Sequence, residues 1–160
     1  MIGYRMPTRV HIEPGAIQRL PEAARSLGLA SALLVVDQGL KNHTPWASKA
    51  ERALQETGIR VAIFDQVEQN PRTSTVTKIA EMMREEKLDG VVGLGGGSVI
   101  DAAKAAAMLV DNEQRIEQYE GKNRYLKAPR PFVAIPSTCG TGSEVTWVSV
   151  ITVPEKRAKG

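Results

Sequence analysis

The chain has 160 residues, of which 42% are hydrophobic and 24% charged, as expected for one globular domain. A net charge of +3 from dispersed lysines and arginines is too small to indicate a nucleic-acid partner. No apolar run approaches the roughly 18 residues of a membrane span. The single cysteine, Cys139, excludes an intramolecular disulfide and fits a reducing compartment, so we expect a cytoplasmic protein.

Short aliphatic runs alternate with stretches of helical periodicity along the chain. Gly28 and Gly58 follow two of the helical stretches, where a left-handed C-cap residue is wanted. Strands and helices that alternate at this spacing form right-handed βαβ units. We therefore predict an α/β fold: a Rossmann-like, doubly wound, mostly parallel sheet with helices on both faces. The predicted strands are residues 32–36, 61–64, 91–94 and 132–135, and the predicted helices are residues 17–27, 45–56, 75–86 and 99–110.

Three segments lie outside this alternation. Residues 9–13 and 148–153 both resemble strands and could pair with each other as a peripheral antiparallel β-ribbon. Residues 112–131 are polar and contain Gly121 and Pro129, which predicts a long connection with one short helix. We assign residues 1–160 to one dinucleotide-binding domain.

A glycine-only turn joins the third predicted strand to an alanine-rich helix. Gly95, Gly96 and Gly97 let backbone amides approach a phosphate with no Cβ in the way. The helix start adds unpaired N–H groups and the positive end of its dipole. Ser98 and Asp101 have the S-x-x-D spacing of a capping box, which would fix where the helix begins. Because Ser98 replaces the last glycine of the usual dinucleotide fingerprint, a tight strand-to-helix connection remains the alternative.

Polar residues also follow the other predicted strands. Residues 135–144 place hydroxyls and glycines after the last strand, where open α/β sheets bind ligands; the alternative is a Ser/Thr-rich turn. Asp37 ends the first strand, where a carboxylate commonly accepts from a ribose 2′-hydroxyl and repels a 2′-phosphate. A helix cap would explain Asp37 equally well. Asn70 and Pro71 follow the second strand and could form only a turn.

Two long motifs resemble signatures of the iron-containing (group III) alcohol dehydrogenase family. Residues 95–104 match its GGGSxxDxAK pattern, and residues 135–146 match IPTTxGTGSEVT, with Ser137 in place of a usual threonine. The resemblance implies an N-terminal Rossmann-like domain that binds NAD(P). Glycerol dehydrogenases and dehydroquinate synthases share this architecture, but residues 138–146 fit them less well.

The resemblance also implies roles for individual residues. The glycine turn would hold the cofactor pyrophosphate, the two threonines of the second motif would line its phosphate and nicotinamide end, and Asp37 would favour NAD over NADP. Asn70 would lie near the adenosine, and Lys159 could approach the ribose. The candidate cofactor-binding residues are Asp37, Asn70, Gly95, Gly96, Gly97, Ser98, Asp101, Thr138, Thr141 and Lys159.

The chain departs from the family at the metal site. The family holds Fe²⁺ or Zn²⁺, which polarises the alkoxide, with one aspartate and three histidines from a helical second domain. Only His11 and His43 occur here, both far from any such motif, so we expect no metal ligands and no catalytic residues in this chain.

We therefore predict the cofactor-binding domain of an NAD-dependent, metal-dependent alcohol dehydrogenase, truncated and poorly active alone. An alcohol or aldehyde would bind only if a second domain or partner completes the cleft, and a homo-oligomer would cover the exposed cleft wall. The alternative is a non-catalytic nucleotide-binding or interaction module that has kept the fold and lost the metal site.

Overall fold

The computed structural model describes residues 8–121, 124–146 and 149–154, and its centre is a parallel β-sheet of four strands. The strands lie in the order β2-β1-β3-β4, so the chain moves outward from β1 to β2 and then crosses to the other side of β1. The central residue Leu33 is paired with Ala62 on one side and Val91 on the other. The strands are β1 (Ser31–Val35), β2 (Arg60–Phe64), β3 (Gly90–Gly95) and β4 (Phe132–Pro136).

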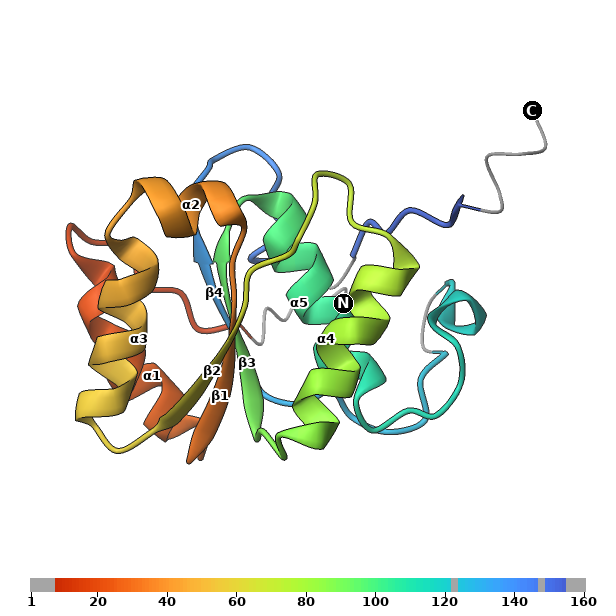
Figure 1. The fold of residues 1–160 in the computed structure, drawn as a ribbon, viewed down its shortest axis with the longest axis horizontal. Helices are drawn as coiled ribbons and strands as arrows, with labels where there is room; N and C mark the ends of the chain where they lie inside the picture. Colours follow the sequence, from red (N-terminus) through yellow and green to blue (C-terminus); the bar gives the residue numbers. More distant parts are fainter. Residues whose placement is uncertain (1–7, 122–123, 147–148, 155–160) are drawn as a thin grey trace, which may run out of the picture.

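Helices cover both faces of this sheet (Figure 1). The 3-10 helix η1 (Ala16–Arg19) leads into α1 (Leu20–Ser26), which packs on the same face as α2 (Gln38–His43) and α3 (Trp46–Glu56). The opposite face carries α4 (Thr73–Glu85) and α5 (Gly97–Leu109). A short 3-10 helix, η2 (Ile116–Tyr119), lies in the long connection from α5 to β4. The Rossmann-like α/β prediction is confirmed, including the short helix in this connection.

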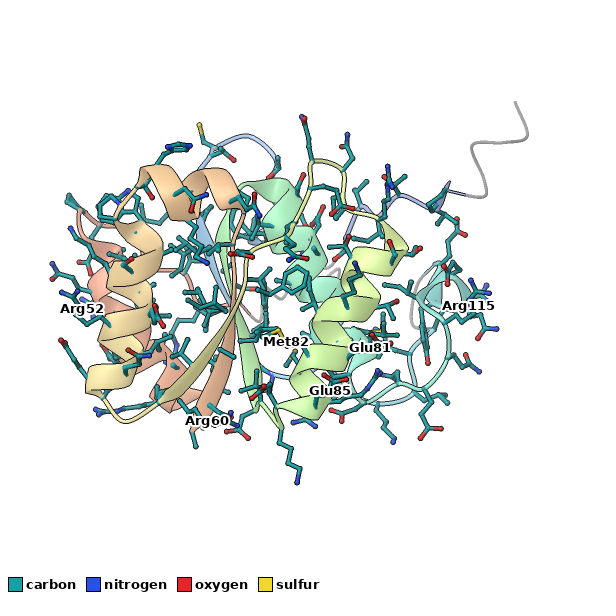
Figure 2. All side chains as sticks on the ribbon, in the orientation of Figure 1. Arg52, Arg60, Glu81, Met82, Glu85 and Arg115 are labelled. Carbon is teal, nitrogen blue, oxygen red and sulfur yellow. The ribbon has the colours of Figure 1, made fainter. Side chains whose placement is uncertain are left out.

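Strand alternation divides the aliphatic core into two halves. Leu33 and Val35 pack against α4 and α5, whereas Leu34 and Val36 pack among α1, α2 and α3. All four side chains are completely buried, since successive residues of a strand point to opposite faces and both faces are covered. Charged side chains such as Arg52, Glu81 and Glu85 lie on the outer sides of the helices, while Met82 points toward the sheet (Figure 2).

Predicted helix positions are confirmed, and one short helix was missed. The alanine-rich α5 and the amphipathic α3 begin and end within two residues of their predicted bounds. Gly28 and Gly58 adopt φ of 76° and 83°, the left-handed conformation expected after a helix. The missed helix is α2, which has six residues and only one buried side chain, Leu40. Such a short element carries too few apolar positions for periodicity to reveal it.

The suggested peripheral ribbon is wrong for the described residues. Residues 8–13 have no strand conformation, and the Ile12 side chain is 92% exposed. Near the other end, Thr152 forms an isolated parallel bridge with Arg72, at the start of α4, and not with residues 9–13. Trp147 and Val148 lie outside the described residues. Within the described ranges, no helix has the length and apolar character needed to cross a membrane.

Candidate cofactor-binding site

Polar residues gather at the carboxyl ends of the strands, which form the upper edge of the sheet in Figure 1. The strand order reverses between β1 and β3, because β1 leads to β2 on one side and β3 lies on the other. Open α/β sheets bind ligands in the crevice outside such a switch point. Asp37 follows β1 and the glycine turn follows β3, so two predicted elements of the site lie on either side of this position.

The glycine turn forms the N-terminus of α5. The N-cap residue is Gly96, so no side chain caps the helix. The first turn of the helix contains no acidic residue. The N–H groups at the start of this 13-residue helix are therefore not claimed by a side-chain cap, which is the arrangement that favours an anion. The turn is also tied to β4, because the Ser137 N–H donates to the Gly95 carbonyl at 2.8 Å.

The two sequence motifs contact each other at the glycines. A Cβ added to Gly97 would lie 2.7 Å from Thr141 Cγ2, and one added to Gly96 would lie 3.3 Å from Thr138 Oγ1. The threonine-containing loop after β4 thus sits directly on the turn after β3. Any side chain at Gly97 would force this loop away. The structure brings the turn together with Thr138 and Thr141, as the sequence predicts.

The predicted capping box is wrong. Ser98 is the second residue of α5 and cannot cap a helix that begins at Gly97. Its hydroxyl oxygen instead accepts from the Asn70 N–H at 3.2 Å, which joins the loop after β2 to the glycine turn. Asn70 adopts a left-handed backbone with φ of 55°, a conformation that asparagine tolerates better than most residues. Because Ser98 accepts from Asn70, its own O–H is left to donate elsewhere.

Asp37 caps α2. Its Oδ1 atom accepts from the Leu40 N–H at 2.8 Å, so the helix-cap interpretation is confirmed. This bond fixes the orientation of the carboxylate beside the carboxyl end of β1. Next to it, Lys41 of α2 forms an ion pair with Asp65, which follows β2. This pair was not predicted from the sequence, although the position of Asp65 directly after a strand was a usable signal.

Asp101 and Lys104 form a second unpredicted arrangement, on the side of α5. Asp101 is only 7% exposed, and its Oδ2 atom accepts from the Val150 N–H at 3.0 Å. The Lys104 ammonium lies 3.6 Å from Asp101 Oδ1 and donates to the Thr146 carbonyl at 3.0 Å. Burial lowers the pKa of Lys104, and Asp101 opposes this shift. Both side chains therefore bind the chain that follows β4.

Lys159, the two histidines and the single cysteine are the remaining residues that the sequence singles out. Lys159 lies outside the described residues. His11 and His43 are exposed, and the described ranges contain no group of three or more His, Cys, Asp or Glu side chains placed to hold a metal ion. Cys139 is an exposed free thiol in the loop between Thr138 and Thr141.

Several known proteins resemble this chain in sequence and in fold. The 1,3-propanediol dehydrogenase of Klebsiella pneumoniae is 38% identical over 160 residues, covering 99% of this chain and 41% of that protein. A crystal structure of 1,3-propanediol oxidoreductase has a TM-score of 0.91 at 37% identity, over 98% of this chain and 41% of that one. Sulfoacetaldehyde reductase from Bifidobacterium kashiwanohense, solved in complex with NAD⁺, has a TM-score of 0.84 at 29% identity, over the same shares.

The chain spans 41% of the length of each of these relatives. The sequence model for the iron-containing alcohol dehydrogenases matches residues 7–160, nearly the whole chain. The chain therefore belongs to the iron-containing alcohol dehydrogenase family.

Proposed function

We propose that this chain is the NAD(H)-binding domain, residues 1–160, of a dehydrogenase that transfers hydride between an alcohol and NAD. The observation that carries the proposal is the contact between the two motifs: the turn at Gly96 and Gly97 is covered on one side by Thr138 and Thr141. This places hydroxyl groups beside a helix N-terminus that has no side-chain cap, at the switch point of a parallel sheet.

The cofactor diphosphate would lie on the turn, bound by backbone N–H groups at the start of α5. Ser98 would donate its O–H to a phosphate oxygen, because the Asn70 N–H already occupies one of its acceptor sites. Thr138 and Thr141 would donate from the loop after β4 without adding charge. The Gly95 carbonyl, which accepts from the Ser137 N–H, would hold that loop against the glycine turn.

Selectivity for NAD would come from Asp37. The bond from the Leu40 N–H holds one carboxylate oxygen, and the other would accept from the adenosine ribose 2′-hydroxyl. The 2′-phosphate of NADP would meet a like charge at this position. Lys159 would approach the same ribose.

The remaining parts of the proposal concern the whole enzyme. The alcohol or aldehyde and the family's divalent metal would bind outside the described residues. We therefore assign no catalytic step to the described residues. The metal would supply a Lewis acid that polarises the alkoxide. Assembly into a homo-oligomer and a cytoplasmic location belong to the same proposal.

Calorimetric titration of the chain with NADH and NADPH tests the cofactor assignment. We expect saturable binding of NADH and weaker binding of NADPH. ADP-ribose, which contains the diphosphate, should displace NADH, whereas adenosine at the same concentration should not, since it lacks the group that the turn recognises. Absence of heat with both dinucleotides would contradict the proposal, and equal competition by adenosine would place the affinity away from the turn.

A further inference from the structure

Asp101 is a buried and Lys104 a half-buried charged residue, and both follow the glycine turn on α5. Their side chains are 9% and 16% exposed, and the Lys104 ammonium lies 3.6 Å from Asp101 Oδ1. Removing two charges from water is costly unless their remaining hydrogen-bonding groups find partners. The partners found here come from one piece of chain, since Asp101 Oδ2 binds the Val150 N–H and Lys104 binds the Thr146 carbonyl. Asp101 Oδ1 accepts no hydrogen bond within the described residues and faces the Lys104 ammonium.

The chain held by Asp101 continues to the other side of the site. We call residues 149–152 the strap. The Thr152 N–H donates to the Pro71 carbonyl at 2.8 Å, and the Thr73 N–H donates to the Thr152 carbonyl at 3.2 Å. The strap therefore joins the side of α5 to the first residues of α4, directly after Asn70.

These contacts close a ring. From Asp101 the connections run through Val150 and Thr152 of the strap to Pro71, then through the neighbouring Asn70 to Ser98, which is on α5 again. The loop carrying Thr138 and Thr141 precedes Thr146, so Lys104 holds its far end. Both walls beside the glycine turn are thus fastened to α5 by the same pair of side chains.

We propose that Asp101 and Lys104 are positioning residues, which fasten the strap and the end of the threonine loop to α5 and so hold the walls of the cofactor cleft in place. The proposal rests on the proposed function for its effect on NADH. It gives Asp101 a role through Val150 in place of contact with the cofactor. It also explains why an aspartate and a lysine stand three residues apart in the first motif.

The test compares Asp101→Ala, Asp101→Asn and Lys104→Met with Asp111→Ala. Asp111 is a matched control, because it also forms an ion pair, with Arg130, but beyond the opposite end of α5. Amide hydrogen exchange is measured on the protein without cofactor, and NADH affinity is measured by calorimetry. Amides of β3 report whether each variant keeps its core.

We expect Asp101→Ala to lose protection at the Val150, Thr152 and Asn70 amides while β3 stays protected. NADH should bind about tenfold more weakly, the loss typical of removing a charge-assisted hydrogen bond. Lys104→Met should weaken NADH binding in the same direction. Asp101→Asn should recover part of both losses, because an amide oxygen can still accept from Val150. Asp111→Ala should change neither the three amides nor the affinity.

Three results would overturn the inference. Unchanged protection at the three amides in Asp101→Ala would show that the pair does not hold the strap. Weaker NADH binding with unchanged protection would instead indicate direct contact between Asp101 and the cofactor. Lost protection with unchanged NADH affinity would show that the strap does not shape the cleft. If the unaltered chain binds no NADH, the proposed function fails, whereas the exchange at Asn70 still decides whether the strap holds the cleft wall.

Discussion

The two ends of the parallel sheet are built from different chemistry. At the amino end, Asp89 accepts from the Ala30 and Ser31 N–H groups at 3.0 and 2.9 Å, and the Ser31 hydroxyl accepts from the Asp89 N–H. Arg130, just before β4, forms an ion pair with Asp111. Polar groups there bind one another across neighbouring strands. At the amino end, the hydrogen bonds and the ion pair therefore satisfy the polar groups and stabilise the sheet.

The carboxyl end instead carries the groups to which we assign cofactor binding. A helix N-terminus without a side-chain cap, a Ser98 hydroxyl with its donor left over, and a loop of threonines lie together above the glycine turn. Its internal ties, such as the Asp101 contact with Val150, lie behind the turn. Substitutions at the amino end should therefore change stability alone, whereas those at the carboxyl end should change cofactor affinity.

The largest effect is expected at Gly97. Gly97→Ala places a Cβ 2.7 Å from Thr141 Cγ2, so the threonine loop must move and NADH should bind roughly 100-fold more weakly, about 2.7 kcal/mol. The double variant with Thr141→Gly removes this clash. Calorimetry on Gly97→Ala, Thr141→Gly and the double variant then separates two reasons for the glycine. Recovery to the level of Thr141→Gly alone would mean that only the loop needs the space, and no recovery would mean that the diphosphate needs it too.

The second effect tests the amino end. Asp89→Ala leaves the Ala30 and Ser31 N–H groups without their acceptor, which should lower the free energy of unfolding by about 2 kcal/mol. Urea unfolding followed by circular dichroism measures the loss. NADH affinity of the folded variant should stay as in the unaltered chain. A large change in affinity would show that the two ends of the sheet are not independent.

A smaller effect is expected for cofactor selectivity. Asp37→Asn keeps an oxygen that can accept from the Leu40 N–H and removes the charge. The preference for NADH over NADPH should fall about tenfold, equivalent to about 1.4 kcal/mol, because the 2′-phosphate no longer meets a like charge. Parallel titrations with both cofactors measure the ratio. An unchanged ratio with α2 intact would assign the selectivity to another residue.

Much of this arrangement could be predicted because it depends on local pattern. Aliphatic runs of four or five residues marked all four strands, and the glycine turn between β3 and α5 marked the ligand-binding end. The contacts of Asp101 with Val150 and of Ser98 with Asn70 could not be predicted, since they join positions 49 and 28 residues apart. The S-x-x-D spacing predicted a local bond between Ser98 and the helix backbone. In the structure Ser98 binds Asn70 and Asp101 binds Val150 instead.

The same limit explains the failed ribbon. Alternating residues at 9–13 indicate that a strand could form there, but they do not say which edge would pair with it. In the structure Val10 and Ile12 remain exposed, and Thr152 pairs with the chain before α4. Alternation of this kind therefore predicts conformation only when a partner strand is also identified.

The smallest predicted effect is the acid sensitivity of the amino end. The hydrogen bond from Arg130 holds the pKa of Asp111 below its usual value. At a pH between the folded and the unfolded pKa of Asp111, the unfolded chain therefore binds more protons than the folded chain. The resulting stability is present above the unfolded pKa of about 3.9 and is lost as the pH falls through the folded value. Urea unfolding measures the free energy of unfolding at pH 6 and at about pH 3. Between these pH values it should fall further for the unaltered chain than for Asp111→Asn. Because the Arg130–Asp111 pair is about one third exposed, salt should reduce the difference between the two proteins. An equal loss of stability between the two pH values in both proteins would mean that the charge of Asp111 contributes nothing to stability through this pair.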